Sequence, residues 1–267
     1  MKQAVGLDKE KIKQSFSAAS LSYDQYAKLQ REVALALLND CNIENPNGTL
    51  VDLGCGTGFL TAELLRLMPF SASQAIIALD IALPMLRAAR CKLAHRPTVR
   101  YLCADAERLP LVGQSVDAVF SSLALQWCSH PETLFADIKR ILRPGGQLFF
   151  STFGSGTLQE LKQAWSEVDS HCHVNDFFSE EQLQQFLQNA GFRQIQMAER
   201  NYRPTYDSVI DLMKELKAIG AHNVTLGRNK HLTTRAQLQQ MISAYESQQA
   251  GPGVSATFTA FLISARA

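Results

Sequence analysis

Short apolar runs alternate with amphipathic segments along most of this 267-residue chain, which is the pattern of an α/β protein. The run at 75–79 is apolar at every position, as expected for a strand of a parallel sheet that is buried on both faces. The segment at 25–39 instead places apolar residues at helical spacing. This pattern predicts strands at 49–53, 75–80, 99–106, 115–123, 147–153, 192–198 and 255–264, and helices at 8–19, 25–39, 59–67, 83–95, 131–142, 157–168 and 179–190.

Two segments fall outside this alternation and divide the chain into three parts. Residues 1–40 precede the first strand and are interpreted as an N-terminal helical cap. Residues 199–253 separate the sixth and seventh predicted strands and are too long for a plain loop, so a substrate lid is expected there. The remaining residues, 41–198 and 254–267, are assigned to one ligand-binding domain.

The turn at 51–58, V-D-L-G-C-G-T-G, joins the first predicted strand of this domain to its first helix. Its glycines are Gly54, Gly56 and Gly58. Glycine permits positive φ and lets the backbone approach a ligand, and the helix N-terminus that follows presents unpaired N–H groups. The dinucleotide fingerprint G-x-G-x-x-G would need a glycine where Phe59 stands. Asp52 would repel a pyrophosphate and suits a cationic ligand such as S-adenosylmethionine (SAM), which carries ammonium and sulfonium groups.

The octet at 51–58 resembles the first motif of the class I SAM-dependent methyltransferases, E/D-x-G-x-G-x-G. L-R-P-G-G at 142–146, before an apolar strand, is a second feature of that superfamily. The resemblance implies a Rossmann-like α/β fold with a seven-stranded, mostly parallel sheet whose last strand is antiparallel. The N-terminal helices and a helical lid insert would be added to this SAM-binding methyltransferase domain. The motif residues assigned to the cofactor, SAM, are Asp52, Gly54, Gly56 and Gly58.

Acidic residues end the second and third predicted strands, at the edge where open α/β sheets bind ligands. Asp80 lies about 20 residues past the glycines, where an acidic side chain accepts hydrogen bonds from ribose hydroxyls. Ile81 and Met85 are candidates for the adenine face, although core residues would show the same pattern. The resemblance implies that Asp105 and Ala106 bind adenine, and capping of the following turn is the alternative for Asp105.

The carboxyl end of the fourth predicted strand is expected to face the transferred methyl group, which assigns Leu123 to the cofactor site. Trp127 is interpreted as the wall of an apolar, water-poor pocket that positions the reactants, or as a core residue. Tyr23 and Tyr26 lie between the two N-terminal helices and are candidates to close over SAM or the substrate. Simple packing on the domain is an equally compatible interpretation for each tyrosine.

Several segments outside the cofactor motifs resemble the malonyl-[acyl-carrier protein] O-methyltransferases of biotin synthesis. They are 15–19, 23–30, 123–128, 156–161, 173–177, 212–221, 227–228 and 232–235. One departure is 248–259, which is rich in Gly and Ala where that family has an aromatic-proline approach to the last strand. The resemblance implies methyl transfer from SAM to the free carboxylate of malonyl-acyl-carrier protein or malonyl-CoA, giving the methyl ester used as primer in biotin (pimeloyl) synthesis. The predicted substrate contacts are Tyr26, His173, Phe177, Lys217 and Arg228.

The chemistry of a malonyl carboxylate fits this set of residues. Its pKa is about 4, so it is ionised at pH 7 and methylation of its oxygen requires no general base. A cation is expected to hold it, and 214–235 carries five basic residues against one acid. Lys217 and Arg228 are preferred among these five, and most of the others are expected to be solvated. His171-Cys172-His173 alone is a weak metal signal, so no metal is predicted.

Composition limits the remaining classes of function. The net charge of +1 gives no general attraction to nucleic acid or membranes, and no apolar run is long enough to span a bilayer. Six cysteines without C-x-x-C spacing indicate reduced thiols in a cytoplasmic protein, which we expect to be a monomer. The basic segment 87–100 indicates a solvated face or a dock for an acidic partner protein. A methyltransferase of another small acid or a quinone precursor, and a non-catalytic SAM-binding module, are the alternatives.

Overall fold

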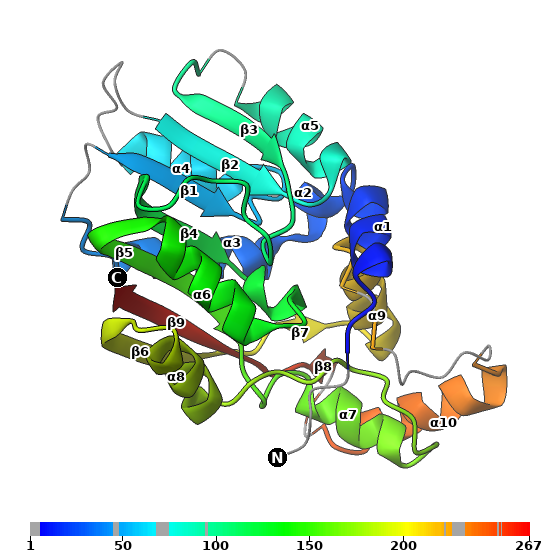
Figure 1. The fold of residues 1–267 in the computed structure, drawn as a ribbon. Coiled ribbons are helices and arrows are strands. Elements are labelled where there is room, and N and C mark those ends of the chain that lie inside the picture. The colour runs from blue at the N-terminus through cyan, green and yellow to red at the C-terminus, as the bar shows by residue number, and fades with distance from the viewer. Residues whose placement is uncertain are drawn as a thin grey trace.

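A seven-stranded sheet with the order β3-β2-β1-β4-β5-β9-β6 forms the centre of the molecule (Figure 1). The computed structural model describes residues 6–44, 48–67, 75–93, 96–221, 223–225, 233–249, 251 and 253–267. Its strands are β1 (Thr49–Leu53), β2 (Ala75–Asp80), β3 (Val99–Cys103), β4 (Val116–Ser122), β5 (Leu142–Phe153), β6 (Arg193–Tyr202), β7 (Thr205–Tyr206), β8 (Val254–Ser255) and β9 (Phe258–Arg266). Its helices are α1 (Lys9–Ala19), α2 (Tyr23–Tyr26), α3 (Lys28–Asn39), α4 (Phe59–Leu67), α5 (Leu83–Lys92), the short 3₁₀ helix η1 (Leu125–Trp127), α6 (Pro131–Ile141), α7 (Gln159–Ser166), α8 (Glu180–Asn189), α9 (Val209–Ala218) and α10 (Arg235–Glu246).

Parallel pairing joins β3, β2, β1, β4 and β5, whereas β9 lies between β5 and β6 and pairs antiparallel with both. The predicted fold class, a mostly parallel seven-stranded sheet with an antiparallel last strand, is therefore confirmed. The strand order reverses between β1 and β4. Open α/β sheets bind ligands outside the carboxyl ends of their strands at such a reversal.

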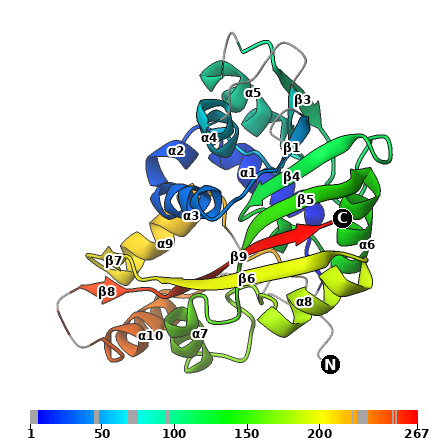
Figure 2. The ribbon, with the colours of Figure 1, turned by 90° about the vertical axis from the view of Figure 1, so that its left-hand side faces the viewer.

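Helices cover both faces of the sheet, which explains the continuous apolar runs in its central strands. The face covered by α3 and α4 buries Leu50 and Ile76, while the face covered by α6 and α8 buries Val51 and Leu79. These four strand residues are at most 1% exposed. Beyond the sheet, α7 and α10 lie side by side (Figure 2). Among the described helices, none is both long and apolar enough to cross a bilayer.

The element boundaries differ from the predicted ones in several places, and β5, for example, begins at Leu142 rather than at 147. The helix predicted at 25–39 is interrupted at Ala27, whose ψ of 41° ends α2 before α3 begins. The sixth strand continues to Tyr202, which pairs with Phe258, so the chain leaves the sheet four residues beyond the predicted boundary at 198. The last strand begins at Phe258, because Ser255 pairs instead with Thr205 in a small second sheet.

The N-terminal helices are held between the sheet and α9. The Ser22 hydroxyl donates a hydrogen bond to the Ala218 carbonyl at the end of α9, over 2.9 Å. Gly220, just beyond α9, packs so closely on α1 that an added Cβ would lie 3.0 Å from the Ser15 carbonyl oxygen. This packing fixes α1 and α2 beside the carboxyl ends of the central strands (Figure 1).

Candidate active site

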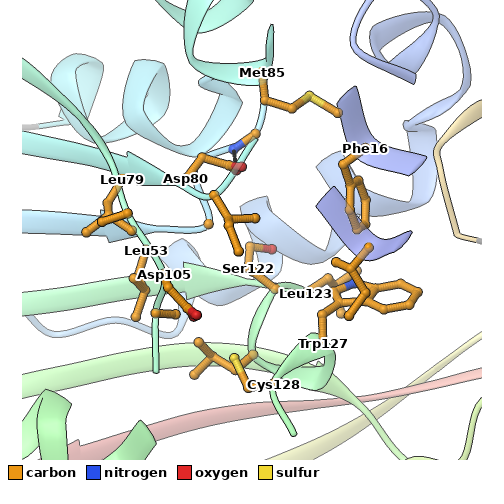
Figure 3. Close-up of a pocket in the computed structure, with 18 of the residues that line it drawn as sticks. Phe16, Leu53, Leu79, Asp80, Met85, Asp105, Ser122, Leu123, Trp127 and Cys128 are labelled. Atoms are coloured by element: carbon orange, nitrogen blue, oxygen red, sulfur yellow. Dashed lines mark hydrogen bonds between the residues drawn. The ribbon is translucent and has the colours of Figure 1, made fainter. Parts of the chain in front are cut away.

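Three adjoining cavities lie at the carboxyl ends of β1, β2 and β4. Chamber A, with about 770 Å³ of empty space including its mouth, is bordered by Gly54, Asp80, Met85, Asp105, Leu123 and Trp127 (Figure 3). Chamber B is bordered by Asp24, Gln30, Asp52, Gly54, Thr57 and Ser122. Chamber C is bordered by Phe16, Gln126, Phe153, His173, Asn175 and Phe177. Tyr23 lines all three chambers, so it stands where they meet.

The glycine loop between β1 and α4 lets the backbone reach chambers A and B. Gly54 has a φ of 74°, a backbone conformation that disfavours any residue with a side chain. A Cβ at this position would also lie 2.2 Å from the Ala124 Cβ, which is too close. Gly58 has a φ of 83° and a different role, because its missing Cβ leaves room for Ala89 of α5 at 3.0 Å. Gly58 thus packs two helices together and does not line the chambers, although it belongs to the same motif.

Asp80 organises this loop as well as bordering chamber A. Its two carboxylate oxygens accept hydrogen bonds from the backbone N–H groups of Gly56 (2.9 Å) and Ala82 (2.8 Å). Burial raises the pKa of Asp80, and these backbone hydrogen bonds oppose the rise. A carboxylate has about four acceptor positions, so Asp80 can accept a further hydrogen bond from a ligand in chamber A. Figure 3 shows the side chain between Met85 and the end of β1.

Two buried acceptor atoms in chamber B have no hydrogen-bond partner among the residues that the structure describes. Asp52 is 1% exposed, and its Oδ2 accepts a hydrogen bond from the Thr61 hydroxyl while its Oδ1 accepts none. Burial, reinforced by the charge of Asp80, raises the pKa of Asp52 to about 7. Gln30 of α3 contributes the second orphan acceptor, its Oε1. Buried acceptors without donors are costly, so a cationic donor group in this chamber would complement both atoms.

An ion pair at the mouth of chamber A joins α1 to the turn after β3. The Lys9 ammonium, 37% exposed, lies 2.6 Å from Asp105 and also contacts Glu107. Asp105 further accepts a hydrogen bond from the Glu107 backbone N–H, so it caps the turn and borders chamber A at once. Lys9 was not predicted, because nothing in its local sequence marks a contact that spans 96 residues.

A second polar contact ties α2 to the glycine loop. Asp24 accepts a hydrogen bond from the Thr57 hydroxyl (2.6 Å) and pairs with Lys92 of α5 (2.5 Å). Burial raises the pKa of Asp24, but these two partners outweigh burial and hold the pKa below its ordinary value. Lys92 is therefore engaged in the structure although it is exposed, as are its basic neighbours Arg87 and Arg90.

Aromatic side chains separate chamber A from chamber C. The rings of Phe16 and Trp127 meet edge to face with centroids 5.3 Å apart, and Figure 3 shows them facing one another. Both rings line both chambers, and the role of Trp127 in positioning the reactants stays a prediction. Farther into chamber C, Phe153 and Phe177 meet at 5.7 Å in the same manner. Burial and the nearby Asp80 raise the pKa of the Tyr23 hydroxyl, which is neutral at pH 7.

The remaining residues that were predicted to contact cofactor or substrate and that border a chamber lie in chambers A and C. Chamber A is also lined by Ile81, Ala106 and Leu123. In chamber C, the His173 ring stacks on Trp165 at 3.8 Å and is hydrogen-bonded to Asp169 (2.8 Å). Among the described residues, no group of three potential metal ligands occurs.

Two of the predicted substrate contacts do not border the chambers, and a third lies outside the described residues. Tyr26 is 41% exposed and lines none of them. Lys217 lies on the exposed side of α9 and also lines none of them. Arg228 falls outside the described residues. Their contacts with a substrate stay predictions.

Solved structures and a family model give the class of protein. A putative methyltransferase from Bacillus halodurans C-125 superposes with a TM-score of 0.59 at 17% identity, covering 87% of this chain and 97% of that one. Phosphoethanolamine N-methyltransferase 2 of Haemonchus contortus, solved with SAM, gives 0.59 at 18% identity over 93% of this chain and 57% of that one. A model described as a methyltransferase domain matches residues 51–150. The fold, the matched domain and the three chambers define a class I SAM-dependent methyltransferase, with SAM as cofactor.

Relatives found by sequence identify the family more specifically than the solved structures do. The malonyl-[acyl-carrier protein] O-methyltransferase of Methylococcus capsulatus is 42% identical over 92% of this chain and 88% of that protein. The enzyme of the same name from Hahella chejuensis is 41% identical over 94% of this chain and 88% of its own length. The biotin biosynthesis bifunctional protein BioHC of Cellvibrio japonicus is 40% identical over 97% of this chain, which spans only 50% of that relative. The chain belongs to the malonyl-[acyl-carrier protein] O-methyltransferase family.

Proposed function

We propose that this chain transfers the methyl group of SAM to the free carboxylate of a malonyl group on acyl-carrier protein, forming a methyl ester for biotin synthesis. Relatives that carry this name support the proposal, at 41–42% identity over more than nine-tenths of the chain. The observation that carries it is the junction of chambers A, B and C at Tyr23, where a cofactor's reactive end would meet an acceptor.

The polar residues of chambers A and B suit the parts of SAM. Asp80 would accept hydrogen bonds from the ribose, and Asp105 with the Ala106 backbone would hold adenine in chamber A. The ammonium group would meet the orphan oxygens of Asp52 and Gln30 in chamber B. When bound, SAM supplies an electrophilic methyl group on a cationic sulfur.

The acceptor must be oriented toward the methyl group and shielded from water, but it does not need a general base. A malonyl carboxylate is ionised at pH 7, so the new C–O bond forms as the S–C bond breaks and no proton has to move. Phe16 and Trp127 would exclude water from the junction, and alignment in a dry site accounts for much of such a rate enhancement. His173 is held by Asp169 and by stacking on Trp165, which suits a wall residue more than a base.

Residues 203–253, the part of the predicted lid segment that lies beyond β6, would close the acceptor side as a lid. Leu216 and Ile219, in and just after α9, line chamber C and support this role. Basic residues of the same segment, with Lys217 and Arg228 preferred, would attract the acidic carrier protein or its phosphopantetheine arm. The six cysteines, none in a disulfide where the structure describes them, agree with a cytoplasmic enzyme, and we propose that it acts as a monomer.

The proposal is tested by incubating the chain with SAM and malonyl-carrier protein, with acetyl-carrier protein as the matched control that lacks only the carboxylate. Intact-protein mass spectrometry should show one added methyl group on the malonyl form alone. Malonyl-CoA in a parallel reaction measures whether the carrier protein is required. No added mass on any acceptor, while SAM still binds, would contradict the proposal and favour a different acceptor or a non-catalytic SAM-binding role.

A further inference from the structure

The Gln126 side chain projects from η1 into chamber C with its orientation fixed by β5. Its Oε1 accepts a hydrogen bond from the Phe153 backbone N–H (3.1 Å) and a longer one from the Thr152 hydroxyl (3.5 Å). A backbone N–H is always a donor, so the amide oxygen must face Phe153 and the NH₂ group must point away from it. Among the described residues, that NH₂ group has no hydrogen-bond acceptor.

The Tyr23 hydroxyl is a second donor at the same boundary. Tyr23 lines chamber C as well as A and B, and its hydroxyl forms no hydrogen bond with the described residues. Its pKa is raised by burial and by Asp80, so the phenol keeps its proton and donates. Two neutral donors from different elements, η1 and α2, thus border the place where acceptor and cofactor would meet.

Most other polar side chains of chamber C are already engaged; the exception is Gln30, which also lines chamber C and whose Oε1 has no partner among the described residues. The Thr157 hydroxyl donates to the Thr259 carbonyl, and His173 is bonded to Asp169. Asn223 uses its amide nitrogen on the Cys172 carbonyl. The described residues that line chamber C include no lysine and no arginine.

We propose that Gln126 and Tyr23 form a carboxylate-binding subsite that holds the acceptor's reactive carboxylate by neutral hydrogen bonds. This inference rests on the proposed function and names the residues that select its substrate. Neutral donors bind one carboxylate oxygen without neutralising the group, so the other oxygen keeps its nucleophilicity. Hydrogen bonds to an ionised acceptor are roughly twice as strong as neutral ones. Methylation removes the charge, so the same subsite holds the ester product less tightly and favours its release.

The critical variant is Gln126→Glu, which keeps the shape and the acceptor for Phe153 but replaces the donor with a negative charge. Gln126→Met removes the donor without adding charge, and Tyr23→Phe removes the second donor. Gln188→Glu on the exposed side of α8 is the matched control for the added charge. Calorimetry with S-adenosylhomocysteine verifies that each variant folds and keeps its cofactor site.

Each variant is assayed for kcat/KM with malonyl-carrier protein and for inhibition by malonyl-pantetheine and its terminal amide, malonamoyl-pantetheine. Q126E, Q126M and Y23F should each lose about 10- to 100-fold in kcat/KM, the range for a hydrogen bond to a charged group. Wild type should bind the carboxylate analogue more tightly than the amide, and Q126E should reverse that preference. The control Q188E should match wild type.

The outcomes separate this inference from the proposed function. If wild type methylates malonyl-carrier protein but Q126E stays within twofold of it and keeps the preference for carboxylate, the subsite is overturned and the proposed function stands. If wild type transfers no methyl group to malonyl-carrier protein, the proposed function fails and the subsite fails with it.

Discussion

The protonation of Asp52 should control the affinity for SAM. Its carboxylate is buried in chamber B with one oxygen unpartnered, and its pKa is raised to about 7. Only the ionised form attracts an ammonium group, and a bound cation lowers the pKa of a neighbouring carboxyl. Because the pKa of the unliganded protein lies near 7, affinity should be lost as the pH falls through that value and be fully present above it.

The size of the effect follows from the fraction of Asp52 that is ionised before SAM binds. With a pKa of about 7, about 90% is ionised at pH 8 and about 10% at pH 6. If the bound state requires the ionised form, the ionisation of Asp52 by itself should raise the Kd about tenfold between pH 8 and pH 6. Asp52→Asn keeps the shape of the side chain and removes this titration.

Isothermal titration calorimetry of both proteins at pH 6, 7 and 8 measures the effect. The α-amino group of SAM itself titrates near pH 8, so the useful quantity is the Kd of D52N divided by the Kd of wild type at each pH. This ratio cancels the ligand's own titration and should be about tenfold larger at pH 8 than at pH 6. A ratio that does not change with pH would refute the assignment of Asp52 to the ammonium group.

Three further substitutions give distinct expected results. Asp80→Asn should weaken SAM binding about tenfold or more by calorimetry, because it removes a charged ribose acceptor; an unchanged Kd would exclude that contact. Gly58→Ala should lower the free energy of unfolding by about 1–3 kcal/mol, through crowding of Ala89 and the positive φ, and an unchanged thermal midpoint would contradict this. Lys9→Met should raise the SAM dissociation rate about two- to fivefold in stopped-flow measurements by freeing α1 from Asp105, whereas an unchanged rate would show that this ion pair does not hold the cofactor in place.

The fold was predictable because its signals are local. A strand buried on both faces is apolar throughout, and a helix against a sheet repeats its apolar residues at helical spacing, so β1, β2 and β4 with α4 and α6 follow from periodicity. The break at Ala27 was not predictable, because the apolar spacing continues across it and only packing against α9 distinguishes α2 from α3. The extension of β6 depends on its partner β9, which lies far away in the sequence.

The grouping of the predicted cofactor residues around chamber A was predictable because each sits at a fixed place in a strand-turn-helix unit, while their contacts with SAM stay predictions. Asp80, Asp105 and Leu123 all border chamber A as their positions after strands suggest. Lys9 and Gln126 were missed as site residues for a physical reason. Their roles depend on side-chain contacts between separate elements, and an isolated lysine or glutamine in a sequence carries no sign of such contacts.

The most direct test of the account identifies the atom that receives the methyl group. The chain is incubated with SAM carrying a ¹³C-labelled methyl group and with malonyl-carrier protein, and the product is examined by carbon NMR. The account predicts a single labelled methoxy carbon of an ester, which mild alkali releases as methanol. Label on a carbon atom of the malonyl group, label on the carrier polypeptide, or no transferred label would contradict it.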